Sequence, residues 1–357
     1  AVPYTEQQVE LVGSLAAQAA VALENSQLYT DIRELFEGFV KASVIAIEAR
    51  DPATSGHSFR VANLCVAFAE TIDSAAGKFA LVHFSKDELR TIRYAALLHD
   101  FGKVGVPEAV LVKAKKLYPQ QLDLVRERFK LARRARELAS MQARLDCALQ
   151  HGSDAYRQRV RMFDAELASA VQELDLQLEE VERANEPTVL KDGTFDQLLK
   201  IAASTFQDVG GVVRPLLADG EVQLLSLRKG TLSPAERAQI EAHVLQSYRF
   251  LSQIPWTREI RQIPAITLGH HEKMNGTGYP HKLSAPDLPI QTRMMTISDI
   301  FDALSAADRP YKRAVPIERA LDILGLAVKE GELDPDLFAL FVEARVYDRW
   351  LVEPYPY

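Results

Sequence analysis

The N-terminal part of the chain carries a hydrophobic pattern of helical spacing. Between residues 28 and 42 the apolar positions recur in alternating steps of four and three: Leu28, Ile32, Leu35, Phe39 and Ala42. Such a seam is typical of a coiled coil, although a core helix of a single domain has nearly the same periodicity. Upstream, Thr5 and Gln8 fit a capping box at the start of the same helix. We therefore expect one long N-terminal helix.

Two further helical series lie in the middle of the chain. Leucines recur at intervals of seven from Leu131 through Leu145, and a second apolar series runs from Val160 to Val181. Between them, QHGSD (150–154) contains a glycine and new capping residues, which are typical of one helix ending and another beginning. The two series predict an antiparallel helical hairpin, each series forming its inner seam. Its simplest role is that of a spacer or a support for a dimer.

The composition of the chain mainly excludes certain classes of protein. The 357 residues exceed the length of one ordinary domain, about 100–200 residues, so two units are expected. Apolar residues at 47% and charged residues at 25% indicate a soluble globular protein. The net charge of −7 argues against a partner that is a nucleic-acid polymer. No apolar run reaches the length of a membrane span, about 18 residues. Cys65 and Cys147 are isolated, so we expect no disulfide framework and a cytoplasmic location.

Histidines and carboxylates recur in an order that suits a metal centre. Five of the eight histidines fall in four short segments, and a fifth segment adds carboxylates. Neighbouring residues on a helix point about 100° apart, so one ion rarely binds both members of the His99-Asp100 pair. Two closely spaced ions can do so if the carboxylate bridges them. Imidazole mixed with carboxylate favours Fe, Mn, Zn or Ni over Ca or Mg.

Each segment alone has an ordinary explanation. A His-Asp dipeptide is more often a surface or capping pair, His243 alone fits a helix surface, and GTGYP (276–280) alone is a turn. The conjunction is different, because the doublets His99-Asp100 and His270-His271 occur in this order with Asp299 downstream. We expect these segments to meet in one dinuclear centre that acts on a phosphodiester.

Three motifs together resemble the HD-GYP family, a bacterial branch of the HD metallohydrolases: HDFGKVGVPE (99–108), HHEKMNGTGYP (270–280) and SDIFDALSAADRPYK (298–312). The resemblance implies an all-α, HD-type helical bundle with an N-terminal coiled-coil signalling helix and an inserted helical hairpin. It places the catalytic domain at 35–330, interrupted by a mostly helical insertion at 118–226 and followed by a helical tail at 331–357. The family hydrolyses the bacterial second messenger cyclic di-GMP to pGpG or GMP.

Carried over residue by residue, the family's pattern assigns roles in this chain. Lys103 would act in catalysis by facing the substrate phosphate, with Arg309 and Lys312 also binding substrate. Tyr279, in the loop that names the family, would contact the substrate or dock a partner of the GGDEF type. Asp100 would bridge the two ions. The metal ligands would be His57, His99, Asp100, His243, His270, His271 and Asp299.

Two positions depart from the family's pattern. Many members carry a glutamate four residues before the first histidine, where it binds a third metal, but this chain has Ala53 there. We therefore expect two divalent transition-metal ions per chain, iron or manganese first and zinc or nickel as alternatives. A two-metal site argues against complete hydrolysis to GMP, which leaves pGpG as the alternative product. Asn275 replaces a common aspartate, a minor change because asparagine also supports a turn.

Outside the catalytic motifs, two further resemblances bear on organisation. YTEQQVELVGSLAAQAAVALENSQLY (4–29) resembles the last helix of GAF sensor domains. That resemblance implies that residues 1–34 are the end of a sensor domain and its linker, and that the helix pairs two chains in a homodimer.

The sequence that leads to the family's middle histidine occurs twice, as KAKKLYPQQLDLVRERF (113–129) and LRKGTLSPAERAQIEAHV (227–244). Aligning the copies places Arg128 against His243, so we expect only His243 to bind metal.

The leading hypothesis is a metal-dependent phosphodiesterase that hydrolyses cyclic di-GMP by attack of a metal-bound hydroxide on phosphorus. A rival from another class is a non-catalytic signalling module that binds a cyclic dinucleotide. Retention of all seven expected ligands argues against it, because a binding module has no chemical need for them. A third reading keeps the enzyme and changes the substrate to another cyclic dinucleotide or a nucleotide.

Overall fold

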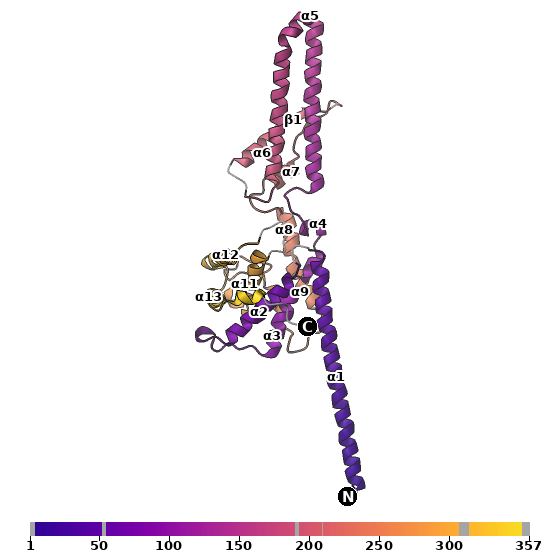
Figure 1. Ribbon diagram of the computed structural model, residues 1–357, viewed down its shortest axis with the longest axis vertical. Helices are drawn as coiled ribbons and strands as arrows, with labels where there is room; N and C mark the ends of the chain where they lie inside the picture. Colours follow the sequence, from indigo (N-terminus) through magenta and orange to yellow (C-terminus); the bar gives the residue numbers. More distant parts are fainter. Residues whose placement is uncertain (1–3, 52–54, 190–192, 209, 307–313, 352–357) are drawn as a thin grey trace. The chain divides into compact units, whose positions relative to one another are not determined.

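Helices dominate the part of the chain that the computed structural model describes, and the predicted all-α fold is confirmed (Figure 1). The contacts within the chain divide it into two compact units. Unit 1 comprises residues 1–108 and 240–357, and unit 2 comprises residues 109–239. The described residues are 4–51, 55–189, 193–208, 210–306 and 314–351.

Unit 1 is built from helices joined by short 3-10 turns. The helices are α1 (Glu6–Glu48), α2 (His57–Asp73), α3 (Lys86–Leu98), α9 (His243–Leu251), α10 (Ile263–Leu268), α11 (Ile290–Ser305), α12 (Ile317–Lys329) and α13 (Pro335–Glu343). The 3-10 turns are η2 (Gly77–Phe79), η3 (Phe101–Gly105), η4 (Ala285–Asp287) and η5 (Val346–Leu351). Two short helices lie where the sequence passes between the units, α4 (Glu108–Leu111) and α8 (Pro234–Glu241).

Helix α1 is the long N-terminal helix that the apolar spacing predicts. Its start carries the expected capping box: Gln8 donates its backbone N–H to the Thr5 hydroxyl, and the Gln8 side chain accepts the Thr5 N–H. The predicted seam is exposed, with Leu35 at 76%. Only the C-terminal turns are buried, where Val40 and Val44 join the core of unit 1.

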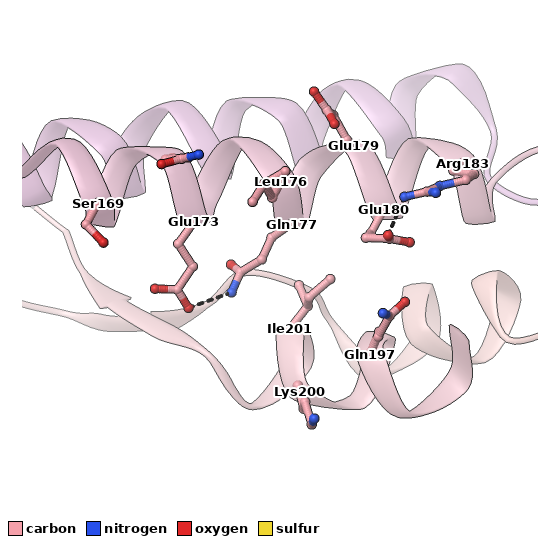
Figure 2. A pocket seen from close by; sticks show the side chains of 11 residues that line it. Ser169, Glu173, Leu176, Gln177, Glu179, Glu180, Arg183, Gln197, Lys200 and Ile201 are labelled. Carbon is pink, nitrogen blue, oxygen red and sulfur yellow. Dashed lines mark hydrogen bonds and ion pairs between the residues drawn. The ribbon is translucent and has the colours of Figure 1, made fainter. Parts of the chain in front are cut away.

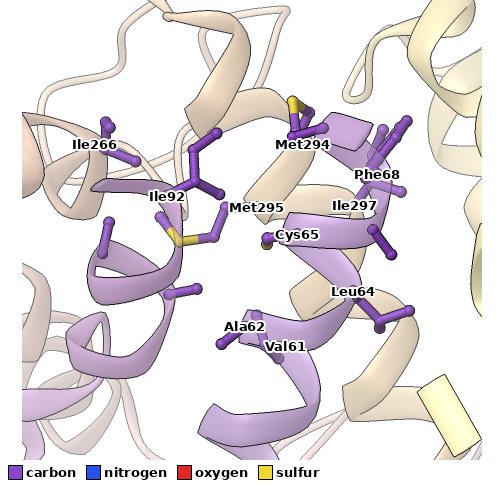
Figure 3. Packing of buried hydrophobic residues seen from close by; sticks show 14 of the residues in the cluster. Val61, Ala62, Leu64, Cys65, Phe68, Ile92, Ile266, Met294, Met295 and Ile297 are labelled. Carbon is purple, nitrogen blue, oxygen red and sulfur yellow. The ribbon is translucent and has the colours of Figure 1, made fainter. Parts of the chain in front are cut away.

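The core of unit 1 lies between α2, α3, α10 and α11 (Figure 3). Cys65 and Phe68 from α2 pack with Ile92 from α3 and Met295 from α11, and all four are almost fully buried. Full burial of one such large apolar side chain contributes about 1.5–3 kcal/mol. This packing fixes the helices at whose ends the histidines and carboxylates lie.

The C-terminal helices belong to the same core. Leu324 of α12, Leu333, and Leu337 and Phe341 of α13 are all buried in it. The Phe341 ring lies 5.3 Å from the Phe68 ring, measured between centroids. The described residues beyond 330 therefore contribute to the packing of unit 1.

Unit 2 contains the predicted helical hairpin. Helix α5 (Pro119–Ala184) turns back on itself at Gly152, whose φ of 82° and ψ of 172° interrupt the helical geometry (Figure 1). A positive φ favours glycine, because a Cβ would clash with the backbone. The hairpin and its break within residues 150–154 are confirmed.

The predicted inner seam of the first arm is wrong. Leu131, Leu138 and Leu145 are 47%, 56% and 52% exposed. This arm has two apolar faces, and a spacing of seven residues does not reveal which face packs on the other arm. The buried positions are instead Leu122, Val125, Phe129, Ala132 and Cys147.

The rest of unit 2 is a small mixed structure beside the hairpin. Helix α6 (Thr194–Ala203) leads to β1 (Thr205–Gln207), which pairs antiparallel with β2 (Val213–Pro215), and α7 (Asp219–Leu225) follows. Phe206 of β1 is buried in a core shared with the hairpin. Among the described residues of both units, none of the helices combines the length and the apolar character needed to cross a membrane.

Candidate metal centre

The predicted metal ligands lie in unit 1, mostly at helix ends, and face one another. His57 opens α2 and His243 opens α9, whereas His99 and Asp100 follow α3. His270 and His271 follow α10, and Asp299 lies within α11. All are buried except His271, which is partly exposed.

Three of the histidines are oriented by the helical turn that precedes them. His99, His243 and His270 each place Nδ1 2.5–2.6 Å from the carbonyl oxygen of the residue three positions earlier. A carbonyl oxygen can only accept, so each Nδ1 carries the proton and donates it. Each Nε2 is then left with a lone pair, which is the form of imidazole that binds a metal.

The carboxylate of Asp100 lies among these nitrogen atoms. Its Oδ1 is 3.2 Å from His243 Nε2, and its Oδ2 is 3.4 Å from His99 Nε2 and 3.8 Å from His57 Nε2. On the other side, Asp299 Oδ1 is 3.2 Å from His57 Nε2. The two oxygens of Asp100 thus lie near different histidines. A carboxylate that bridges two ions needs this arrangement.

The ligand atoms form two groups, His57/His99/Asp100 and His243/His270/His271, and within each group they lie within 4.8 Å of one another. Two observations show that a cation fits. Among the described residues, the buried Nε2 of His99 has no hydrogen-bond partner. His243 Nε2 and His270 Nε2 lie 3.4 Å apart, although both carry lone pairs because their Nδ1 atoms hold the protons. A nearby cation relieves both defects, and this donor set suits a transition metal.

The surrounding charges keep both carboxylates ionised. Burial alone would raise the pKa of Asp100, but Lys103 and His99 hold it well below its usual value. Burial acts on Asp299 in the same way, and His57 outweighs it, so the pKa of Asp299 is also strongly lowered. Both side chains can therefore serve as anionic ligands at neutral pH.

The histidines differ in pKa: that of His57 is raised, whereas those of His270 and His271 are lowered. Burial opposes a charged His57, but hydrogen bonds with Asp299 and Asp302 raise its pKa to about 9. For His271, burial dominates and lowers the pKa to about 4. Burial, with neighbouring histidines, also lowers the pKa of His270 well below its usual value. The group that contains His57 therefore has the stronger local attraction for positive charge.

Lys103 extends the cluster with a fixed cation. Its Nζ lies 2.9 Å from Asp100 Oδ2 and 3.2 Å from Asp51 Oδ2. Burial would lower the pKa of this ammonium, but the two carboxylates raise it above its usual value. Arg309 and Lys312, the other two predicted phosphate-binding cations, lie outside the described residues.

The loop with the GYP sequence is held against the cluster. Tyr279 donates its backbone N–H to the His271 carbonyl at 3.2 Å, and the two rings lie 4.8 Å apart between centroids. The buried Glu272 carboxylate accepts the N–H groups of His281 and Leu283 at 2.6 and 2.9 Å. Glu272 thus anchors the loop that carries Tyr279.

A close backbone approach joins the segments that bear His99 and His243. The Gly102 N–H donates to the Ser247 hydroxyl at 2.7 Å, and that hydroxyl donates to the His99 carbonyl at 2.7 Å. A Cβ at Gly102 would lie 1.9 Å from the His243 carbonyl oxygen. Only glycine fits at this position without displacing the backbone.

Sequence reasoning gave no role to three residues that hold His57. The Glu48 carboxylate caps α2 by accepting the Gly56 and Ser58 N–H groups at 2.8 and 3.2 Å. Asp302 Oδ2 lies 2.7 Å from His57 Nδ1, and Arg60 contacts both oxygens of Asp302. One signal was available: Asp302 follows Asp299 by three residues and therefore shares its helix face.

A separate groove lies within unit 2, between the second arm of α5 and α6 (Figure 2). Its volume is about 700 Å³, and its lining includes Glu173, Gln177, Glu180 and Lys200. Glu173 accepts a hydrogen bond from Gln177 at 3.2 Å. The groove contains none of the predicted site residues and is wide open, so we do not assign it the chemistry of the cluster.

Comparison with known proteins points in the same direction as the cluster. Two family profiles, both described as HD domain, match residues 54–183 and 199–337. A "3'3'-cGAMP-specific phosphodiesterase 3" of Vibrio cholerae is 35% identical over 117 residues, 33% of this chain and 24% of the relative.

Two other relatives carry cyclic di-GMP in their names. A cyclic di-GMP phosphodiesterase of Pseudomonas aeruginosa is 32% identical over 121 residues, 33% of this chain and 27% of the relative. The cyclic di-GMP phosphodiesterase response regulator RpfG of Xanthomonas campestris is 27% identical over 208 residues, 54% of each chain. The chain thus spans between a quarter and about half the length of these relatives.

The helical fold, the His/Asp cluster and the profile matches define a protein with an HD domain. Within that class, the domain is of the HD-GYP type. The resemblance of residues 4–29 to a GAF helix stays a prediction, as do the domain boundaries drawn from the sequence.

Proposed function

We propose that this protein is a metal-dependent phosphodiesterase that hydrolyses a cyclic dinucleotide, with cyclic di-GMP as the first candidate and pGpG and/or GMP as products. The observation that carries the proposal is the placement of Asp100, whose two oxygens lie near histidines of both groups. A carboxylate so placed can bridge two ions. The names of the three relatives supply the substrate class.

The proposed centre holds two divalent ions, iron or manganese first and zinc or nickel as alternatives. One ion would be bound by the His57/His99/Asp100 group and the other by the His243/His270/His271 group, with Asp299 as a further ligand. When bound, such ions supply Lewis acidity, which lowers the pKa of water towards about 7 and neutralises charge on a phosphoryl oxygen. Ala53, which has no ligand atom, supports two ions rather than three.

The protein's own groups position the reactants. The three Nδ1–H···O=C hydrogen bonds hold the Nε2 lone pairs towards the centre before any ion arrives, which limits reorganisation on binding. Lys103 stays protonated and offers its charge to a phosphate oxygen in a buried setting, where electrostatic stabilisation is strongest. We assign Arg309, Lys312 and Tyr279 to substrate binding on sequence grounds.

A second substrate is 3'3'-cGAMP. It is favoured by the 35% identity with a relative whose name specifies that dinucleotide. The two substrates differ in one base and share the phosphodiester ring, so the metal centre serves either. The choice depends on contacts to the base, and direct competition between the two dinucleotides in one assay tests it.

We also propose that α1 pairs two copies of the chain. Its exposed apolar side chains recur at coiled-coil spacing, including Leu28, Ile32 and Leu35 at 51%, 63% and 76% exposure. Burying such a stripe against a second copy removes it from water. An upstream GAF domain and a GGDEF-type partner at the Tyr279 loop complete the proposed signalling context. A cytoplasmic location would match an intracellular messenger.

Turnover by purified protein tests the central proposal. Protein loaded anaerobically with Mn(II) or Fe(II) is expected to convert cyclic di-GMP to a linear product, and a His99→Ala/Asp100→Ala variant is expected not to. Elemental analysis of the same samples should give two ions per chain. Tight nucleotide binding without turnover under either metal would instead support a non-catalytic receptor.

A further inference from the structure

We propose that Asp302, held in place by Arg60, is a positioning residue for His57 that makes the His57/His99/Asp100 group the tighter of the two metal-binding groups. The inference rests on the proposed metal centre and deepens it, because it assigns unequal affinities to the two groups. It concerns a residue that lies within the third motif, three positions after Asp299, but that has no assigned role and is not in the ligand set.

The first observation is the contrast between the histidines. His99, His243 and His270 donate Nδ1–H to a backbone carbonyl three residues earlier. His57 instead places Nδ1 2.7 Å from the carboxylate of Asp302. His57 is the first residue of α2 and follows Gly56, whose φ of 67° is left-handed, so no preceding helical turn offers it a carbonyl. A side chain from α11 takes that role.

The second observation is that Asp302 is fixed on both oxygens. Arg60 Nε lies 2.7 Å from Oδ1, and Arg60 Nη2 lies 3.1 Å from Oδ2. Asp302 is fully buried, and a buried carboxylate is held tightly when a guanidinium fork meets both its oxygens. Arg60 lies three residues after His57, one turn along the same helix, so the pair moves together with the ligand it orients.

The third point is chemical. A carboxylate that accepts the Nδ1–H of a histidine fixes the ring's orientation and makes Nε2 a stronger electron donor than a neutral carbonyl does. His57 Nε2 points to the centre, since it lies 3.2 Å from Asp299 and 3.8 Å from Asp100. A stronger donor and a larger share of negative charge both favour the ion in the group with His57.

The experiment measures metal affinity directly, apart from activity. Metal-free full chain is titrated with MnCl2 by isothermal titration calorimetry, and the wild type is expected to show two binding events of different affinity. Asp302→Asn keeps a neutral acceptor but removes the charge. It should weaken the tighter event about 10- to 100-fold and leave the weaker one unchanged. His57→Ala identifies the tighter event by abolishing it.

A matched control separates positioning from general structure. Asp334 also pairs with an arginine, Arg293, at 3.0 Å and is mostly buried, but it caps α13 and contacts no histidine in the described chain. Asp334→Asn is expected to lower thermal stability and leave both Mn affinities at their wild-type values. Arg60→Met, which leaves Asp302 in place but unfixed, should weaken the tighter event less than Asp302→Asn does.

The outcomes are distinct. Two Mn events of wild-type affinity in folded Asp302→Asn would overturn this inference and leave the metal centre standing. A wild type that binds no Mn would overturn the proposed function and this inference with it. If Asp302→Asn does not fold, as judged by circular dichroism, Arg60→Met decides, and an unchanged tighter event in that variant rejects the proposal.

Discussion

Two clusters of buried ionisable groups, one in each unit, are paired in opposite ways. In unit 2, the buried Lys113 ammonium lies 2.8 Å from the Glu236 carboxylate, which also accepts the Tyr118 hydroxyl at 2.7 Å. Donors and acceptors match there, and the cluster is complete. In unit 1, His243 and His270 bring two lone pairs together at 3.4 Å. A complete polar cluster stabilises a fold, whereas an incomplete one indicates a ligand that supplies the missing charge.

The duplicated sequence sharpens the same contrast. Both copies begin a helix with proline, at Pro119 and Pro234, and both place a side-chain acceptor three residues after the cap. Downstream they diverge: Arg128 pairs with Glu221 inside unit 2, and His243 joins the histidine cluster of unit 1. Similar local sequence thus leads to a largely buried ion pair in one copy and to a candidate metal ligand in the other.

The largest expected effect concerns the bridge. Asp100→Ala removes a carboxylate shared by both ligand groups, so we expect loss of metal and a fall in turnover of about 1,000-fold or more, equivalent to several kcal/mol. Elemental analysis and a cyclic di-GMP assay measure both. His151→Ala, in unit 2, serves as a control that should keep metal and activity. If the Asp100→Ala variant kept its full metal content, the histidine cluster of unit 1 would not depend on Asp100 to hold its ions, and the contrast with the complete cluster of unit 2 would fail.

The next effect isolates Lys103 from the ligands. Lys103→Met removes the charge proposed to face phosphate, and we expect turnover to fall about 100-fold. Metal content should stay near that of the wild type, because no predicted ligand atom is removed. Lys103→Arg should restore part of the rate. If turnover and metal fall together, Lys103 acts through Asp100 rather than on the substrate.

A third change tests the close backbone contact in unit 1. Gly102→Ala drives a Cβ towards the His243 carbonyl, so we expect a loss of about 1–3 kcal/mol in the free energy of unfolding. Gly220→Ala in α7 of unit 2 is the matched change, because nothing lies within 4 Å of its Cβ position. That variant should be up to about 1 kcal/mol more stable, since alanine favours helix. Chemical denaturation of both variants measures the difference.

A fourth test uses the complete cluster of unit 2. Burial would raise the pKa of Glu236, but Lys113, Tyr118 and Ser233 lower it from 4.5 to about 2. The folded form therefore holds the proton less tightly than the unfolded form, and Glu236 contributes stability above pH 4.5 that is lost as pH falls towards 2. Glu236→Gln should show a stability deficit that is constant above pH 5 and shrinks below it. A deficit independent of pH would contradict the ion pair.

The smallest effect concerns the hairpin face. Leu138→Gln lies on the exposed face of α5, so the free energy of unfolding should change by no more than about 0.5 kcal/mol. Phe129→Ala, on the buried face of the same arm, should cost about 3–5 kcal/mol. Urea denaturation compares the two. If both variants lost the same free energy of unfolding, the face with the leucines at intervals of seven would also be packed, as the sequence predicted.

Local sequence was enough for several features. The capping box at Thr5, the long helix that follows it and the break at Gly152 all depend on residues within a few positions of one another. The types of residue at the cluster were also recognisable, because imidazole and carboxylate in that order limit the chemistry. The packed face of the hairpin was not, since an arm with two apolar faces satisfies the same periodicity.

Tertiary structure alone decided which atoms meet. His57 and Asp302 are 245 positions apart, yet their side chains lie 2.7 Å from each other. At His57, His99, His243 and His270, Nε2 rather than Nδ1 is left for the cluster because a carbonyl or carboxylate oxygen lies beside Nδ1. Chain neighbours determine helix and turn, because those interactions are local. The orientation of the His57 ring and the charge beside it depend on Asp302, which the packing of α2 against α11 brings to it. Such a contact exists only after the helices have packed on a common core.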